Sequence, residues 1–138
     1  MLTDSLKEFL ERYSEHSSTV FRLGIGTVIL FSGVHKLVNP AVWASYIAPV
    51  FADLMSQIGL TGTLFMKANG VFEILFGAAL TLDKYTTVAA GLVTLSMAGI
   101  ILNLALGGAG YMDVIIRDIG LLLLALGVTL QSARREKE

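Results

Sequence analysis

The stretch RLGIGTVILFSGVHKLVNP, residues 22–40, decides the fold because it has the composition of a membrane span that ends in charge. Residues 19–38 are mostly Val, Ile, Leu, Phe and Gly. A helix needs roughly 20 apolar residues to cross a hydrocarbon layer about 30 Å thick, and this run supplies them. His35 and Lys36 nevertheless stand side by side near its end, before Asn39-Pro40 breaks the pattern. The positions of the other polar residues indicate why.

The 138-residue chain as a whole is too apolar for an ordinary soluble domain. Hydrophobic residues make up 54% of it, charged residues make up 15%, and the mean hydropathy is +0.72. The stretches long enough to span a membrane are about 19–38, 62–82, 87–106 and 112–131. We therefore expect a single membrane domain over residues 1–138.

Short connections favour antiparallel neighbours among these spans. Asp83-Lys84-Tyr85 joins the second to the third, and Gly107-Gly108-Ala109-Gly110 joins the third to the fourth. We predict an all-α fold, an integral membrane four-helix bundle with up-down-up-down topology. Small residues at helical spacing predict close packing of the helices, and they are Gly26, Gly33, Gly70, Gly77, Ser96, Gly99 and Asn103.

Two further segments flank the first span. Residues 1–18 place apolar and charged side chains on different faces of a helix, which predicts an amphipathic helix on the membrane surface. Its net charge of −2 favours docking on a protein partner over anchoring to anionic lipid. In the longer connection 39–60, Asn39 is a good N-cap and Pro40 suits the first helical turn. The Trp and Tyr residues of this connection predict an interfacial segment at headgroup level.

The distribution of Lys and Arg predicts the orientation. Those on the side shared by both termini are Lys7, Arg12, Arg22, Lys84, Arg134, Arg135 and Lys137, and those towards the other side are Lys36, Lys67 and Arg117. Seven against three favours cytoplasmic N- and C-termini by the positive-inside rule. We therefore expect a multi-pass protein of the cell membrane.

With the spans so oriented, polar side chains from all four gather in the outer half of the bundle. They are His35, Lys36, Lys67, Asn69, Glu73, Asn103, Asp113, Arg117 and Asp118. Glu73 shares an inward face with the glycines of the second span, and a charge inside a span must be paired or neutralised. The sequence leaves three partners open for it: Lys36, Lys67 and Arg117. If the second span begins at Thr61, Glu73 lies roughly 18 Å along it and Lys36 reaches it poorly. If it begins near Lys67, the gap closes to about 9 Å and this pairing becomes plausible.

Functional and structural interpretations compete at each of these residues. We take Lys36, Glu73, Arg117, His35 and Asp118 as candidates for ligand binding or proton exchange. The supporting polar residues are Lys67, Asn69, Asn103 and Asp113. In the structural interpretation Lys67 extends to the interface, Glu73 forms an ion pair and Asn103 forms an interhelical hydrogen bond. Asp113 and Arg117 are four residues apart and can pair along their helix.

The inventory of side chains excludes several chemistries. The chain has no cysteine, and its two histidines, His16 and His35, lie at opposite ends of the first span. A bis-histidine haem, an iron–sulfur cluster and a metal site are therefore not expected. A net charge of −1 gives no case for nucleic acid. We therefore expect the chain itself to carry no cofactor.

The chain resembles the DoxX-like family of small four-helix prokaryotic membrane proteins. The resemblance rests on RLGIGTVILFSGVHKLVNP (22–40) and GVFEILFGAALTL (70–82), with a weaker match in RDIGLLLLALGV (117–128). It implies a multi-pass membrane protein, and some relatives accompany quinone-linked enzymes such as terminal quinol oxidases. Any electron carrier must then come from a ligand or from another subunit.

Three hypotheses follow for the function. In the first, the protein is an accessory subunit of a quinone-linked redox complex without independent catalytic activity, and its outer polar cluster contacts the quinone. In the second, it is a structural subunit of a larger membrane assembly, or a homo-oligomer, with no ligand. In the third, it is a small transporter or proton pathway in which Glu73 carries the proton.

Overall fold

The computed structural model describes residues 2–138, without the side chain of Leu2. Within this range there are only helices and their connections, with no strand. The elements are α1 (Leu2–Ser14), α2 (Ser17–Val38), α3 (Pro40–Ala44), α4 (Pro49–Gln57), α5 (Gly62–Thr81), α6 (Thr86–Leu106), the 3₁₀ helix η1 (Ala109–Tyr111) and α7 (Met112–Arg135). The all-α prediction is confirmed, and each predicted span corresponds to one long helix.

Three of the long helices in the described chain, α2, α5 and α6, are long and apolar enough to cross a membrane. The sequence predicted a fourth span in α7, which has 24 residues but is not among these three. Asp113, Arg117 and Asp118 lie in its first two turns. The fourth crossing and the orientation of the termini stay predictions.

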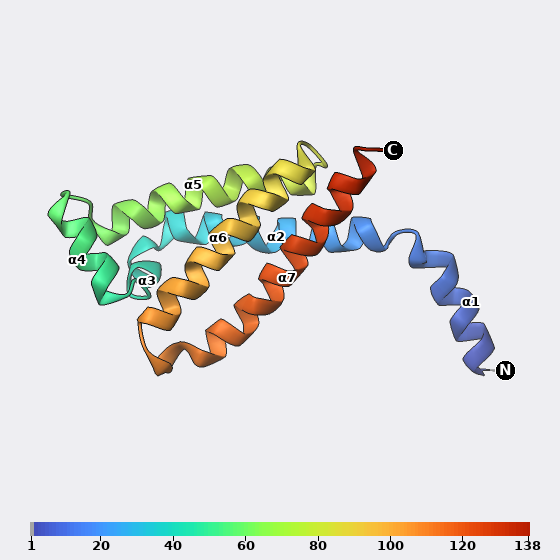
Figure 1. Cartoon of the computed structure of the whole chain (residues 1–138), viewed down its shortest axis with the longest axis horizontal. Coiled ribbons are helices and arrows are strands. Elements are labelled where there is room, and N and C mark those ends of the chain that lie inside the picture. The colour runs from blue at the N-terminus through green and yellow to red at the C-terminus, as the bar shows by residue number, and fades with distance from the viewer. Residues whose placement is uncertain (1) are drawn as a thin grey trace.

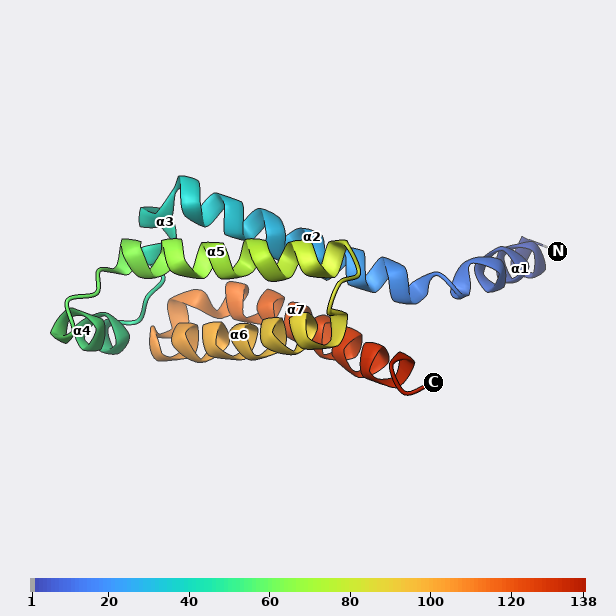
Figure 2. The same ribbon diagram turned by 90° about the horizontal axis from the view of Figure 1, so that it is seen from above.

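The long helices form two pairs that lie in two layers (Figures 1 and 2). α2 and α5 run side by side in opposite directions, and so do α6 and α7. Figure 1 shows the second pair crossing the first obliquely, and the layers touch where α5 contacts α6 and α2 contacts α7. α1 and the end of α7 lie at one end of the molecule, and α3 and α4 lie at the other.

Glycines let α2 and α5 approach until their backbones touch. A Cβ atom on Gly33 would lie 2.7 Å from the carbonyl oxygen of Gly70, and one on Gly77 would lie 2.5 Å from the amide nitrogen of Leu30. No larger residue fits at either position unless a backbone moves, so these predicted small-residue stripes are packing surfaces. On α6, a Cβ on Gly99 would meet no atom within 4 Å. The small-residue stripe predicted on α6 therefore does not bring another helix close to Gly99.

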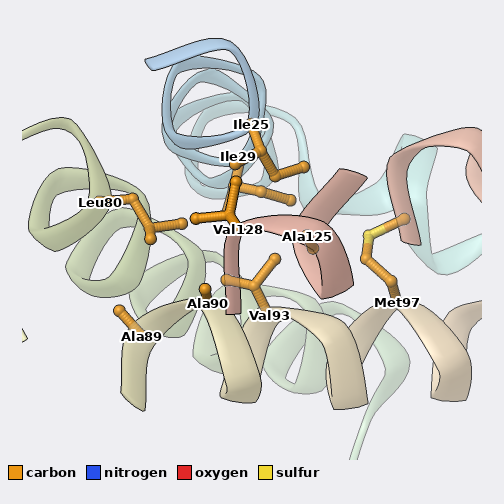
Figure 3. Packing of buried hydrophobic residues seen from close by; sticks show 9 residues of the cluster. All are labelled: Ile25, Ile29, Leu80, Ala89, Ala90, Val93, Met97, Ala125 and Val128. Carbon is orange, nitrogen blue, oxygen red and sulfur yellow. The ribbon is translucent and has the colours of Figure 1, made fainter. Parts of the chain in front are cut away.

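An apolar core joins the two layers in the half of the molecule nearer the chain termini (Figure 3). Its members come from all four long helices and are Ile25, Ile29, Leu80, Ala89, Ala90, Val93, Met97, Ala125 and Val128. Three of the nine are alanines, so α6 and α7 can come close to the other layer here. This core closes one end of the molecule and leaves the other end to the polar residues.

A polar cluster ties three elements together beyond the core. The Arg135 guanidinium donates two hydrogen bonds to the Asp83 carboxylate, at 2.9 and 3.1 Å, and the Thr86 hydroxyl donates a third at 2.6 Å. These bonds, that from Arg135 first, lower the pKa of Asp83 to about 2. Arg22 donates to two main-chain carbonyls in the last turn of α5, and its Nε lies 3.6 Å from Asp83. The cluster therefore links α2, the α5–α6 turn and α7.

The amphipathic helix predicted over residues 1–18 is shorter, because α1 ends at Ser14 and α2 begins at Ser17. Residue 1 and the side chain of Leu2 lie outside the described part of this prediction. α1 projects away from the helix pairs in both views (Figures 1 and 2). Its apolar side chains are more than half exposed, and they are Leu6, Phe9, Leu10 and Tyr13. Its apolar face is thus uncovered, whereas its place on a membrane surface stays a prediction.

The connection between α2 and α5 forms two short helices, each with proline in its first turn. Pro40 therefore behaves as predicted. Asn39 does occupy the N-cap of α3, but its side chain makes no capping hydrogen bond. The side-chain nitrogen Nδ2 of Asn39 lies instead 3.4 Å from Nε2 of His35, which is one helical turn earlier in the chain. The connection covers the end of the helix pairs opposite the termini.

Gly77→Ala tests the backbone contact between α2 and α5. The added methyl group meets main-chain atoms of Leu30, so we expect a loss of about 1–3 kcal/mol in the free energy of unfolding. Thermal unfolding in detergent, followed by circular dichroism, measures it. Gly99→Ala is the matched control, because its methyl group enters open space and should leave stability equal or slightly higher. Equal stability of the two variants would contradict the packing model.

Candidate functional site

A cavity of about 1120 Å³ lies in the half of the bundle that the apolar core leaves open. Side chains of α2 to α7 line it, and most of them are apolar. The polar lining residues are Thr27, Ser32, His35, Lys36, Tyr46, Asn69, Glu73, Ser96, Asn103, Arg117 and Asp118, together with the indole of Trp43. A large apolar cavity with a few convergent polar groups is the usual form of a ligand site.

The ion pair between Lys36 and Glu73 forms the centre of the polar lining. Nζ of Lys36 lies 2.5 Å from Oε1 of Glu73 and 2.7 Å from Oδ1 of Asn69. The Lys36 and Glu73 side chains are each only 3% exposed. The glycine contact between Gly33 and Gly70 places these residues at the same level of α2 and α5. The free-energy cost of removing these charges from water is offset here by charge pairing and hydrogen bonding.

This outcome decides among the three partners that the sequence left open for Glu73. α5 does begin at Gly62 with Thr61 as its N-cap, the case in which Lys36 was expected to reach Glu73 poorly. That expectation was wrong because it assumed that α2 ends level with the start of α5. α3 and α4 separate the two ends, and the Lys36 side chain packs beside Gly70 in the interior of α5.

A second pair of charges reaches the cavity from α7. Nε of Arg117 lies 3.1 Å from Oδ1 of Asp118, and the two side chains are 65% and 7% exposed. The Asp118 carboxylate also interacts electrostatically with Lys36. The spacing in the sequence suggested that Arg117 could pair with Asp113, one turn away. In the structure Arg117 pairs with its neighbour Asp118 instead. Charges from α2, α5 and α7 therefore meet around one space.

One atom of the buried pair has no partner. Oε2 of Glu73 is buried, yet it makes no hydrogen bond to any residue that the structure describes. An unsatisfied buried acceptor costs about 1–3 kcal/mol, and more when it is charged, so such an atom requires an explanation. Because Glu73 lines the cavity, a molecule in that space can supply the missing donor.

Trp43 covers the ion pair from the side of α3. Its ring centroid lies 4.7 Å from Nζ of Lys36, which is a cation–π contact. Its indole Nε1 donates a hydrogen bond of 2.8 Å to Nδ1 of His35. His35 and Lys36 point about 100° apart on the helix, and Trp43 nevertheless contacts both. The sequence predicts only that the aromatic residues of this connection lie at headgroup level, and it does not indicate this role of Trp43.

Asn103 fixes the rest of the connection over the cavity. Its Oδ1 accepts from the backbone N–H of Ala48 at 2.9 Å, and its Nδ2 donates to the carbonyl of Tyr46 at 2.8 Å. Sequence analysis expected an interhelical hydrogen bond, but both partners lie in the link between α3 and α4. Asn103 therefore holds this link against α6.

Two of the supporting residues from sequence analysis lie elsewhere. Lys67 and Asp113 are exposed and do not line the cavity. Lys67 lies to one side of the inward stripe of α5, and Asp113 is in the first turn of α7. The other seven residues of the predicted polar group do line the cavity. Within the described range, no three His, Cys, Asp or Glu side chains are grouped to hold a metal ion.

With this geometry established, comparison with known proteins identifies the family. The family model described as DoxX matches residues 17–106. This chain belongs to the DoxX family. The matched residues run from α2 to α6 and include the Lys36–Glu73 pair, whereas α7 with Arg117 and Asp118 lies beyond them. The resemblance inferred from sequence is confirmed. No curated protein and no solved structure matches the chain.

Lys36→Met tests the energetics of the buried pair. Removing the cation leaves a buried carboxylate without compensation, so we expect a loss of about 3–5 kcal/mol in the free energy of unfolding. In the double variant Lys36→Met/Glu73→Met most of this loss should return, because apolar side chains of similar volume replace both charges. Thermal unfolding in detergent measures both, and Lys67→Met, which removes an exposed cation, is the control. A double variant as unstable as the single one would contradict the coupling.

Proposed function

We propose that this DoxX-family membrane protein binds a quinone-class molecule in its cavity and acts as an accessory subunit of a quinone-linked redox complex. The observation that carries the proposal is the unpartnered Oε2 of Glu73, buried at the wall of an apolar cavity of about 1120 Å³. Lys36, Glu73, Arg117, His35 and Asp118 are the proposed ligand or proton-exchange residues. Asn69 and Asn103 support them.

The shape and lining of the cavity suit a ring with an apolar tail. The volume of about 1120 Å³ is slightly above the usual range for small-molecule sites, about 300–1000 Å³, so the cavity can hold more than a single ring. Apolar side chains from α4, such as Phe51, Leu54 and Met55, extend the lining away from the charges. A head group near Glu73 and a tail along these side chains would satisfy both parts of the wall.

An accessory role fits the residues that the chain offers for electron transfer. The sequence contains no cysteine, and His16 and His35 are near opposite ends of α2. In the proposed complex the electrons therefore pass through the bound quinone and a partner subunit. The residues of this chain bind the ring, pair the charges and exclude water.

The proposed orientation has both termini in the cytoplasm and α7 as the fourth span. It is supported by the excess of Lys and Arg at the end that carries the termini. The cavity then opens in the outer half of the membrane, beneath α3 and α4. Trp43 and Tyr46 on this connection would lie near the headgroups, where such rings are enriched.

The single tryptophan of the chain provides a direct test of binding. Trp43 lines the cavity, so a quinone bound there should quench its fluorescence saturably in lipid nanodiscs. Ser96→Phe places a ring in the cavity and should weaken the apparent affinity about tenfold or more. Leu95→Phe adds the same ring at the neighbouring position, which is 70% exposed, and should behave as wild type. Quenching that never saturates, or that both variants leave unchanged, would refute a site in the cavity.

The subunit role is supported by α1. Its apolar face is uncovered, and a net charge of −2 over residues 1–18 disfavours an anionic lipid surface. We therefore propose that α1 docks on a protein surface of the complex that is neutral or basic.

A photo-crosslinking residue in place of Phe9 tests this docking in native membranes. Phe9 is 58% exposed on the apolar face, so we expect a covalent adduct with a second protein chain. The same residue in place of Glu8, on the polar face, is the control and should give much less adduct. Adducts with lipid alone would rule out protein docking. A protein adduct without quinone binding would instead favour the purely structural subunit.

A further inference from the structure

We infer that Glu73 and Asn69 select the head group of the ligand, and that they select the reduced, hydroxyl-bearing ring over the oxidised, carbonyl-bearing one. This inference rests on the proposed function, since it concerns the redox form of the molecule in the same cavity. It follows from the hydrogen-bonding groups that the ion pair uses and from those it leaves unused.

Two of the three donors of the buried cation are already engaged. Lys36 has three N–H groups, and two of them point to Oδ1 of Asn69 and Oε1 of Glu73. The same ammonium faces the Trp43 ring at 4.7 Å and is attracted by the Asp118 carboxylate. A quinone carbonyl, which only accepts hydrogen bonds, therefore finds at most one N–H group of this cation left to donate.

The open position on Glu73 is an acceptor. Oε2 is buried and unpartnered among residues 2–138, while Oε1 of the same carboxylate accepts a hydrogen bond from Lys36. A hydroxyl group can donate to this oxygen in a charge-assisted hydrogen bond, which is among the stronger kinds. A carbonyl oxygen in the same place would bring two acceptors together in a site of low dielectric, where such contacts are costly.

Asn69 supplies the complementary donor. Because Lys36 donates to its oxygen, the side-chain amide must turn its NH₂ group away from Lys36, and Asn69 lines the cavity. Asn69 and Glu73 are one turn apart on α5, so they present an N–H donor and an oxygen acceptor on the same face. A hydroxyl both donates and accepts, and it can therefore satisfy the two side chains together.

A matched series of ligands tests this selection in wild-type protein. A short-chain hydroquinone, its quinone and its dimethyl ether share one ring and differ only at the oxygens. Calorimetry in nanodiscs under anaerobic conditions should show the hydroquinone binding at least about tenfold more tightly than either of the others, since only it can donate to Glu73. Tighter binding of the quinone would overturn the inference, because Glu73 would then act as a donor.

Glu73→Gln tests the residue. Lys36 will hold the amide oxygen of the glutamine, so the NH₂ group takes the place of Oε2 and converts an acceptor into a donor. We expect the order of affinities to reverse, with the quinone binding at least as tightly as the hydroquinone. Asp113→Asn makes the same change of carboxylate to amide at an exposed residue outside the cavity and should keep the wild-type order. An unchanged order in a folded Glu73→Gln protein would overturn the assignment to Glu73.

The remaining outcomes separate this inference from the function on which it rests. If the three ring compounds bind with equal affinity, the cavity is a quinone site without redox selection, and only the inference fails. If none of them binds, the proposed function fails. An isoprenoid alcohol without a ring is the last ligand, and it should bind more weakly than the hydroquinone. Equal binding would mean that a lipid hydroxyl is recognised and that the quinone assignment is wrong.

Discussion

The ion pair between Lys36 and Glu73 is the interaction on which the rest of this structure depends. Charges in the interior of a membrane protein must be paired, and these two can pair only if α2 and α5 lie very close together. Gly33 and Gly70 provide that approach, because their backbones touch beside the pair. A shift of either helix by one residue would separate the charges and bring Cβ atoms into the backbone contact. Electrostatics and steric fit thus specify the same register.

The pair also marks the boundary between two differently built halves of the molecule. Towards the termini the layers meet through small apolar side chains such as Ala89, Ala90 and Ala125. Towards α3 and α4 the layers enclose a cavity, and the charges of α2, α5 and α7 face it. The charged side chains at the cavity are held by their own bonds, since Lys36 already donates to Asn69 and Glu73. A ligand can therefore be bound by side chains that are already in place, which reduces the entropic cost of binding.

The limits of sequence analysis are visible in particular residues. The helix boundaries were predictable because long apolar runs alternate with short polar ones, and Glu73 stood out because a carboxylate is rare inside such a run. The partner of Glu73 was not predictable. The depth of each residue was counted from the end of its own helix, and residues 39–60 separate the end of α2 from the start of α5. The role of Trp43 depends on where α3 turns back over α2. The cluster of Arg22, Asp83 and Arg135 joins residues that are far apart in sequence, and only the packing of the helices brings them together.

The covering of the cavity by the α3–α4 link has a consequence for how relatives of this protein can differ. Asn103 and Tyr111 hold the link through its main chain, at the carbonyl of Tyr46, the amide of Ala48 and the carbonyl of Ser45. None of these bonds depends on the identity of the side chains in the link. Mutations in the link can therefore change the lining of the cavity without detaching the link from α6 and η1. The residues that attach the link thus differ from the side chains that would select a ligand. One scaffold can therefore evolve to bind different ligands while the link continues to cover the cavity.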